Sequence, residues 1–263
     1  MTELFNRKVE LQIRDKIIRY PDLHIEFETE FDVDSDANNG FIRVYNLSKS
    51  TINDIKKGLP FKLKAGYKNN FGTIMVGSIA SSNTEWNVPD KITELIVSDN
   101  SEDWLSKTVN KTWRKNTRAS TIMKDIADLL PIAIGEIAPV NDNRYPKGKT
   151  FSTKIKVALE ELAADTNSKF HISRGRLFIR EPLKGKQEVV NLNKDTGLIA
   201  TPQRIEDGDE ERWLVQSLLN YRIESDSVIN VESKSINGLY LVKGGSHYLA
   251  GNDFYTEMEV VVI

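Results

Sequence analysis

The residues with the clearest chemical potential are acidic side chains that alternate with apolar ones in one stretch. No lysine or arginine lies between Asp22 and Gly40. Strict alternation is typical of a β-strand with one buried face, so the acids share the other face. The acids of this predicted face are Glu26, Glu28, Glu30, Asp32 and Asp34. Like charges at neighbouring positions repel each other. The pattern favours either a solvated face that discourages aggregation or a surface with a function of its own.

The end of this acidic run, Asp32–Asp36, also resembles a calcium-binding loop. An EF-hand loop that begins at Asp32 needs glycine at its sixth position and glutamate at its twelfth. The chain has Ala37 and Arg43 there. We therefore expect no calcium site in this segment.

Other catalytic or metal-binding patterns are missing from the sequence. There is no cysteine, which excludes disulfides and thiolate metal sites. The histidines His24, His171 and His247 are far apart and match no metal-ligand spacing. Neither a phosphate-binding glycine loop nor a nucleophile elbow occurs. The sequence predicts no cofactor, no metal ion and no catalytic residues.

A basic cluster around Trp113 allows three interpretations. Its members are Lys107, Lys111, Arg114, Lys115 and Arg118. Basic residues interleaved with an aromatic one are found in single-strand nucleic-acid sites. Such a cluster is also typical of a solvated face whose long stems cover apolar surface. The third interpretation is an intersubunit or partner contact to an acidic patch, here Glu206, Asp207 and Asp209.

The elements that would position these residues are mostly strands. Alternating segments predict a long hairpin over 23–45 and further strands up to residue 98. A short helix is expected after Leu47, capped by Ser48 or Ser50 and ended by Gly58. Apolar spacing predicts two longer helices, 118–130 and 152–166, with Ser152 as a possible cap. Between them, 131–149 has three prolines and no clear periodicity, which predicts an ordered loop or partial linker. A hairpin across Arg174-Gly175 follows, and strands return after Gly185, with Asn237-Gly238 as the strongest turn signal.

Composition adds few constraints. The chain has 263 residues and a net charge of −2, so it has no strong overall field that attracts nucleic acid or anionic membranes. No run of about 18 apolar residues is present, so no membrane-spanning helix is expected. The predicted fold class is α+β and mainly β, with β sections before and after a small α/β insert.

Several short motifs occur together in an order known from one family. They are Thr196-Gly197-Leu198, Pro202, the acidic loop 206–211, Ser217–Asn220, Gly238 and Phe254-Tyr255-Thr256. In this order they resemble the C-terminal barrel of phage tail baseplate hub proteins, including the late-control protein D type. Upstream, Val44–Ser48, Ala65-Gly66-Tyr67 and Gly77 resemble the first hub barrel, and 151–179 resembles the small α/β insert.

The resemblance implies two small antiparallel tube-like β-barrels with an α/β insert. The corresponding domains are an N-terminal barrel, 1–101, a small α/β module, 102–185, and a C-terminal barrel, 186–263. Hub proteins of this type are homotrimers, in which three pairs of barrels form a ring of six. That ring joins the hexameric tail tube protein to a trimeric spike protein, and DNA and the tape-measure protein cross its channel. Because the sequence ends at Ile263, no fused peptidoglycan hydrolase is expected.

We interpret the chain as a structural, non-enzymatic baseplate hub subunit of a phage tail or a phage-tail-like particle. The resemblance places it in the virion, after assembly in the cytoplasm of the host bacterium. The acidic strand would then line the channel and let DNA slide without specific binding. Two alternatives stay open: a tail-associated peptidoglycan hydrolase, and a nucleic-acid-binding module that uses Lys107–Arg118.

Overall fold

A computed structural model of the chain describes residues 6–33, 37–68, 70–87, 89–99, 106–182, 184–185, 188–205 and 211–263. The predicted mainly β composition is confirmed, with 57% strand and 11% helix. The strands are β1 (Arg7–Ile13), β2 (Lys16–Tyr20), β3 (Ile25–Asp32), β4 (Asn39–Tyr45), β5 (Pro60–Tyr67), β6 (Asn70–Asn87), β7 (Asp90–Ser98), β8 (Thr108–Trp113), β9 (Thr117–Arg118), β10 (Ala133–Ile137), β11 (Arg144–Tyr145), β12 (Lys149–Lys154), β13 (Lys169–Ser173), β14 (Arg176–Arg180), β15 (Val189–Leu192), β16 (Gln203–Ile205), β17 (Arg212–Leu218), β18 (Val228–Glu232), β19 (Asn237–Ala250) and β20 (Asp253–Val262). The helices are α1 (Lys49–Asp54), α3 (Ala119–Ala127) and α4 (Ile155–Asp165).

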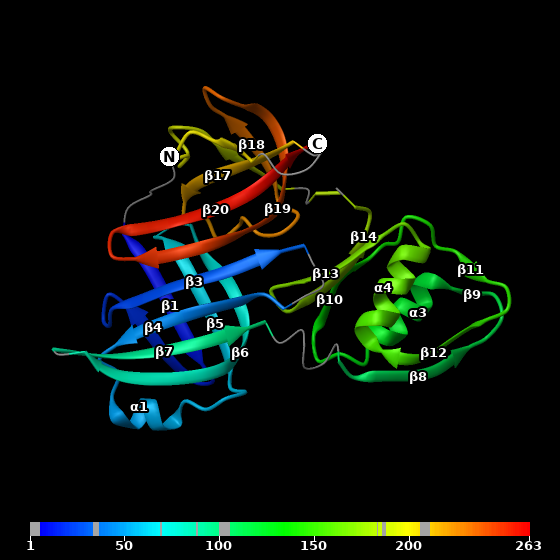
Figure 1. The fold of residues 1–263 in the computed structure, drawn as a ribbon, viewed down its shortest axis with the longest axis horizontal. Coiled ribbons are helices and arrows are strands. Elements are labelled where there is room, and N and C mark those ends of the chain that lie inside the picture. Colours follow the sequence, from blue (N-terminus) through cyan, green and yellow to red (C-terminus); the bar gives the residue numbers. More distant parts are fainter. Residues whose placement is uncertain are drawn as a thin grey trace. The chain divides into compact units, whose positions relative to one another are not determined.

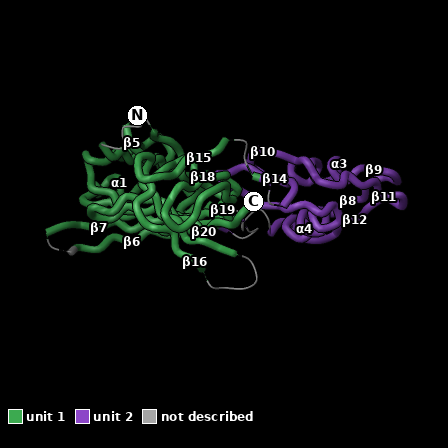
Figure 2. Tube along the Cα trace, turned by 90° about the horizontal axis from the view of Figure 1, so that it is seen from above, with its two compact units in different colours: residues 1–32, 38–99, 185–263 green, residues 33–37, 100–184 purple. Residues whose placement is uncertain are grey.

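The chain divides into two compact units, which Figure 2 shows in different colours. The first unit combines residues 1–32, 38–99 and 185–263, so it contains both β sections. The second consists of residues 33–37 and 100–184 and contains the α/β module. The division of the chain into three domains remains a prediction, which the experiment below addresses.

The first unit is built on one continuous sheet (Figure 1). Its strand order is β16-β17-β20-β19-β3-β4-β7-β6-β5-β1-β2, with β18 and β15 branching from β19. The two β sections meet where β3 pairs antiparallel with β19, from Asp32 opposite Gly244 to Phe27 opposite Leu249. Among the described strands we find no closed barrel, and the sheet remains open at both ends of this order.

Two long strands change partners partway along their length. The first half of β6 pairs with β5 and its second half with β7, with a register shift between Ile79 and Ser81. In the same way, β19 leaves β18 and joins β3 near a register shift between Val242 and Gly244. A bulge bends a strand and so lets one strand serve two layers. At Gly245, beside the second bulge, a Cβ atom would collide with the carbonyl oxygen of Glu257.

The buried face of β3 contributes to two separate apolar cores. Phe27 belongs to the N-terminal core, which also includes Leu249 of β19 and Phe254 of β20. Four residues further along the same strand, Phe31 belongs to the C-terminal core, together with Met258 of β20. Each β section thus has a core of its own, although the backbone ladder joins them.

A row of buried polar residues crosses the sheet between the two cores. Thr29, His247, Thr256 and Ser217 are cross-strand neighbours on β3, β19, β20 and β17, and each is at most 1% exposed. Nδ1 of His247 lies 2.9 Å from Oγ1 of Thr256, within hydrogen-bond distance. Because buried polar groups need partners, this row favours one register of these four strands.

The second unit packs two helices between strands. The ribbon of β8 and β12 is antiparallel, and α4 packs against both strands. A separate three-stranded sheet has the order β10-β14-β13. One apolar core includes Trp113 and Phe151 of the ribbon, Ile126 of α3, Leu159 of α4 and Ile179 of β14.

Several local predictions are confirmed. The hairpin of β3 and β4 lies within 23–45 as predicted. The hydroxyl of Ser48 accepts a hydrogen bond from the Thr51 amide and caps α1. The turn at Arg174-Gly175 joins β13 to β14, and both residues have positive φ angles, 49° and 71°.

Three local predictions are wrong. Ser152 does not cap a helix, because it lies in β12; α4 begins after Lys154 without a side-chain cap. The segment 131–149 is not only a loop, since it contains β10 and β11. The hairpin predicted at Asn237-Gly238 exists, between β18 and β19, and only the position of its turn is wrong: Asn237 pairs with Glu232, so the turn comprises residues 233–236.

The shared strand leads to a prediction about cooperativity. Phe27→Ala and Phe31→Ala should each lower the free energy of unfolding by about 3–5 kcal/mol. Because both residues lie on β3, both substitutions should shift the same unfolding transition. Ile126→Ala, in the core of the second unit, is the matched control and should shift a different transition. Calorimetry of the three variants shows which unfolding transition each substitution shifts. If Phe27→Ala and Phe31→Ala shift separate transitions, the two β sections are independent domains instead.

Candidate functional site

The predicted acidic face exists on β3 and is part of a wider surface. Glu26, Glu28, Glu30 and Asp32 alternate with buried residues along β3. Asp34 lies outside the described residues. The strand lies between β4 and β19 in the sheet, so these carboxylates occupy a central position on its solvent side.

A second column of acids on β20 joins the first across β19. Glu30 is opposite Ser246, and Ser246 is in turn opposite Glu257. Gly244 takes the same place between Asp32 and Glu259. Directly opposite residues of an antiparallel sheet point to the same face. We call the resulting surface the acidic sheet face: Glu26, Glu28, Glu30, Asp32, Glu257 and Glu259.

The sequence prediction missed the two residues on β20, although a signal was present. Glu257 and Glu259 alternate with Thr256, Met258 and Val260, all of which are buried. The alternation identifies their face of β20. It does not reveal that this face continues that of β3, which depends on pairing across about 200 residues of sequence.

Some charges of the acidic sheet face are neutralised by neighbours. Arg212 forms an ion pair with Glu259 at 2.8 Å. Arg43, which lies opposite Glu26 on β4, forms its ion pair with Glu94 of β7 instead, at 2.8 Å. Glu26 accepts a hydrogen bond of 3.2 Å from the hydroxyl of Tyr45. Glu28 has aromatic neighbours instead, with Phe41 on β4 and Tyr248 on β19.

The pKa of Tyr255 reflects its partial burial and the negative charges of the acidic sheet face. Its ring stacks on that of Tyr248, with centroids 5.0 Å apart. Partial burial raises the pKa of Tyr255, and the nearby charges of Glu257 and Glu28 raise it further. The shift has this direction because a negative potential disfavours a second negative charge. The surface therefore combines negative potential with a band of aromatic side chains.

In the second unit, the basic cluster is divided between structural and exposed residues. Nζ of Lys111 lies 2.8 Å from Oδ2 of Asp125, and Arg118 forms an ion pair with Asp142 at 3.1 Å. The hydrogen bond from Lys111 is the main reason why the pKa of Asp125 is lowered. Lys107, Arg114 and Lys115 are exposed at the two ends of β8.

Trp113 cannot act as a stacking platform for bases. It is only 6% exposed, packs in the core of the second unit, and donates a hydrogen bond of 2.8 Å to Asp125. The aromatic part of the single-strand interpretation is therefore wrong. The predicted acidic partner patch, Glu206, Asp207 and Asp209, lies outside the described residues.

Asp142, which is distant in the sequence, caps the N-terminus of α3 in place of the residue at the N-cap position. The N-cap residue Arg118 makes no side-chain cap, whereas Oδ1 of Asp142 accepts a hydrogen bond of 2.9 Å from the Ser120 amide. Partial burial by itself raises the pKa of Asp142. Hydrogen bonds from Ser120 and Arg118 outweigh that effect and hold its pKa below the usual value. A carboxylate is favoured at this end of a helix.

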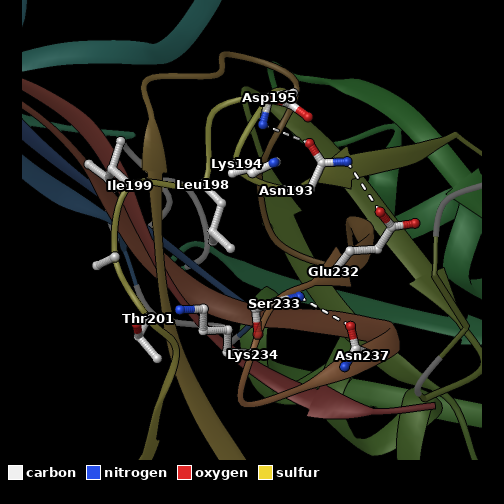
Figure 3. Close-up of a pocket in the computed structure, with 11 residues that line it drawn as sticks. Asn193, Lys194, Asp195, Leu198, Ile199, Thr201, Glu232, Ser233, Lys234 and Asn237 are labelled. Atoms are coloured by element: carbon white, nitrogen blue, oxygen red, sulfur yellow. Dashed lines mark hydrogen bonds between the residues drawn. The ribbon is translucent and has the colours of Figure 1, made fainter.

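A cavity of about 560 Å³ lies between the loop 193–201 and the turn that joins β18 to β19 (Figure 3). The side-chain amide of Asn193 donates to Glu232 at 3.3 Å, and its oxygen accepts from the Asp195 amide. Lys194 and Lys234 also line it. Among the described residues that line it there is no histidine.

The histidines do not form a catalytic arrangement with solvent access. His171 and His247 are at most 1% exposed, and the ring of His171 stacks on Phe178. His24 lies at the surface, 3.3 Å from a carboxylate oxygen of Glu26. The described residues contain no group of three or more potential metal ligands. None of the described helices has the length and apolar character needed to cross a bilayer.

Solved structures with the same fold are phage tail and secretion-system proteins. A tail protein from Neisseria meningitidis MC58 matches with a TM-score of 0.72 and 10% identity, covering 98% of this chain and 97% of that one. The 43 kDa tail protein of prophage MuSo2 from Shewanella oneidensis matches with a TM-score of 0.73 and 9% identity, over 97% and 98% of the two chains. The E. coli c3393 protein, a component of the type VI secretion system, matches with a TM-score of 0.63 and 9% identity, over 96% and 76%.

These similarities define the class of protein: the chain has the fold of phage tail proteins. The model of the family Baseplate hub gp41 matches residues 23–260. The chain belongs to this family of baseplate hub proteins, as the resemblance in the sequence predicted. A search of curated proteins found no match.

The role of Asp142 can be tested through pH. Asp142→Asn keeps an acceptor for the Ser120 amide but removes the negative charge beside Arg118 and the start of α3, so it should lower the free energy of unfolding of the second unit by up to about 1 kcal/mol at pH 7. The pKa of this group is lowered by folding, so its stabilisation is present above the unfolded pKa of about 3.9 and is lost as pH falls through the folded pKa. The variant and the parent protein should therefore converge in stability at acidic pH.

The control for this experiment is Asp128→Asn, at the exposed C-terminal end of the same helix. Stability is measured by urea denaturation at several pH values. An equal loss in both variants at pH 7, or a loss that persists unchanged at acidic pH, would contradict the proposed role of Asp142.

Proposed function

We propose that the chain is the subunit of a homotrimeric hub ring that joins a hexameric tail tube to a trimeric spike. The observation that carries this proposal is the single sheet with two cores. Each chain provides two lobes, with the N-terminal and the C-terminal core respectively. In each lobe a long strand changes partner at a bulge. Three chains with two similar lobes each would present six similar units to the tube, while keeping threefold symmetry for the spike.

The open edges of the sheet provide a means of closing the ring. Backbone pairing of β6 with β5 ends at Ser78, whereas its pairing with β7 continues to Asn87. Among the described residues, the far side of β6 from 80 to 87 is thus an unpaired edge. Trp86 on this segment is 71% exposed. A second edge is offered by β16, which lies at one end of the strand order. If the β6 edge of one copy pairs with the β16 edge of the next copy, the contact is head-to-tail. Repeated head-to-tail contacts form a ring when the rotation from copy to copy adds up to a full turn.

The acidic sheet face is proposed to line the channel of this ring. Its negative potential repels phosphate groups, so that DNA would pass without being held. This repulsion would favour a smooth wall for DNA.

The proposal is of a structural and not an enzymatic role. Its support is the hub family together with the two buried histidines, which a substrate would not reach. The tail tube protein and the spike protein would contact opposite ends of the ring. The protein would be assembled in the bacterial cytoplasm and remain in the baseplate of the particle. A peptidoglycan-digestion assay distinguishes this role from that of a tail-associated hydrolase, since a hub of this kind should release no fragments.

The edge contact can be tested with proline. Along β6, alternate backbone N–H groups point toward β7 and toward the open edge, so of Ser82→Pro and Asn83→Pro one removes an outward donor. That variant should keep its fold but sediment as a monomer, at concentrations where the parent protein is a trimer. The other variant is the matched control. It removes a backbone donor that points toward β7, so it should lower the stability of the β6–β7 hairpin. Trimers that persist in both variants would refute pairing at this edge.

The channel wall can be tested by charge reversal. Glu28→Lys combined with Glu30→Lys should slow genome ejection from assembled particles, because the wall would then attract phosphate. Trimers should still form. Lys56→Glu combined with Lys57→Glu, at exposed positions away from β3, is the control. Ejection at the parental rate by the Glu28 and Glu30 variant would rule out the channel-wall assignment.

A further inference from the structure

The outward face of the ribbon formed by β8 and β12 is entirely polar. Val109, Trp113 and Phe151 point into the core of the second unit. The alternate positions form three cross-strand pairs of exposed residues: Thr108 with Lys154, Asn110 with Ser152, and Thr112 with Thr150. We call these six residues the ribbon face. The hydroxyls of Thr112 and Thr150 lie 3.1 Å apart.

Exposed cations lie at both ends of the ribbon face. Lys107 lies at one end beside Lys154, because its carbonyl oxygen accepts a hydrogen bond of 2.8 Å from the Ile155 amide. Arg114, Lys115 and Lys147 lie at the other end, in the adjoining loops before β12 and after β8. All five side chains are exposed, and none forms an ion pair with another described residue. Segments 107–116 and 147–154 contain no aspartate or glutamate.

The cluster differs from the one that the sequence suggests. Lys111 and Arg118 are neutralised by Asp125 and Asp142. Lys154 of β12, the strand that pairs with β8, and Lys147 in the loop before β12 replace them; both lie about 40 residues later in the sequence. The surrounding module has the same sign. The second unit, residues 33–37 and 100–184, contains sixteen lysines and arginines but twelve aspartates and glutamates, although the whole chain has a net charge of −2.

We propose that the ribbon face, which includes Lys154, and the four cations that flank it bind the phosphodiester backbone of double-helical nucleic acid, without sequence preference. Lysine and arginine side chains together with serine, threonine and asparagine donors are the groups that contact phosphates. The face has no exposed aromatic side chain on which unpaired bases would stack. Its lysine, serine and threonine composition is also unlike a protein interface, which is enriched in aromatic residues, methionine and arginine.

The dimensions of the ribbon fit this ligand. Six residues of β-strand extend about 17 Å. A duplex carries one negative charge per about 1.7 Å of its axis, which gives about ten charges over that length. Five cations at the two ends can therefore each reach a phosphate without bending the duplex. This surface is separate from the acidic sheet face, and the inference does not depend on the ring.

The experiment measures binding of the full chain to a fluorescent duplex of mixed sequence, about 20 base pairs long, by anisotropy at several salt concentrations. Five phosphate contacts predict a slope of log K against log salt of about −4.5. Arg114→Gln, Lys115→Gln and Lys154→Gln combined should make that slope shallower by about 2.7 and weaken binding at low salt at least tenfold.

The control removes three exposed lysines elsewhere: Lys56→Gln, Lys57→Gln and Lys234→Gln. It has the same net charge as the test variant and should bind like the parent protein. Equal weakening in both variants would attribute binding to net charge alone and overturn the assignment. So would no binding at about 50 mM salt, or stronger binding to polyglutamate than to the duplex, which would indicate an acidic protein partner. Preference for single-stranded DNA would contradict the duplex geometry.

Discussion

The antiparallel pairing of β3 with β19 is the constraint on which the first unit depends. It joins residues near 30 to residues near 245, and no other described ladder links the first four strands directly to the C-terminal section. Because side chains alternate along a strand, one register decides both faces at once. With Phe31 opposite Gly245, the apolar residues of β3 enter two cores and its carboxylates meet solvent. A shift by one residue would bury the carboxylates without partners, at a large cost in free energy.

Strand length and bulges determine what else the sheet presents. Because β6 continues beyond its last pair with β5, its second half has a partner on one side only. An exposed strand edge is a site at which another chain can pair. The bulge near Gly244 in β19 has a different consequence. The first half of β19 pairs with β18 and the second half with β3, so both halves have a partner there. The same device therefore gives β19 a further partner along each half and leaves β6 with an unpaired edge.

Charge is distributed unevenly between the two units, and local pairing decides which charges remain exposed. In the module, Asp125 and Asp142 each bind a basic residue and also accept a hydrogen bond from a neighbouring group, the indole of Trp113 or the amide of Ser120. These acids serve the stability of the module. The cations on the ribbon face have no such partners among the described residues and form its electropositive surface. The acidic sheet face of the first unit has the opposite sign.

The sequence by itself determined the local features. The alternation of 25–32 identified the acidic face of β3, the capping hydroxyl of Ser48 identified α1, and Arg174-Gly175 identified a turn, because each depends on neighbouring residues alone. Short motifs also identified the family. Only the tertiary structure decided that Glu257 joins Glu30, that Lys154 joins Lys107, and that Trp113 is buried. These relations depend on pairing between strands or on packing against helices distant in the sequence. Their free energy comes from the assembled sheet and core, which no local pattern encodes.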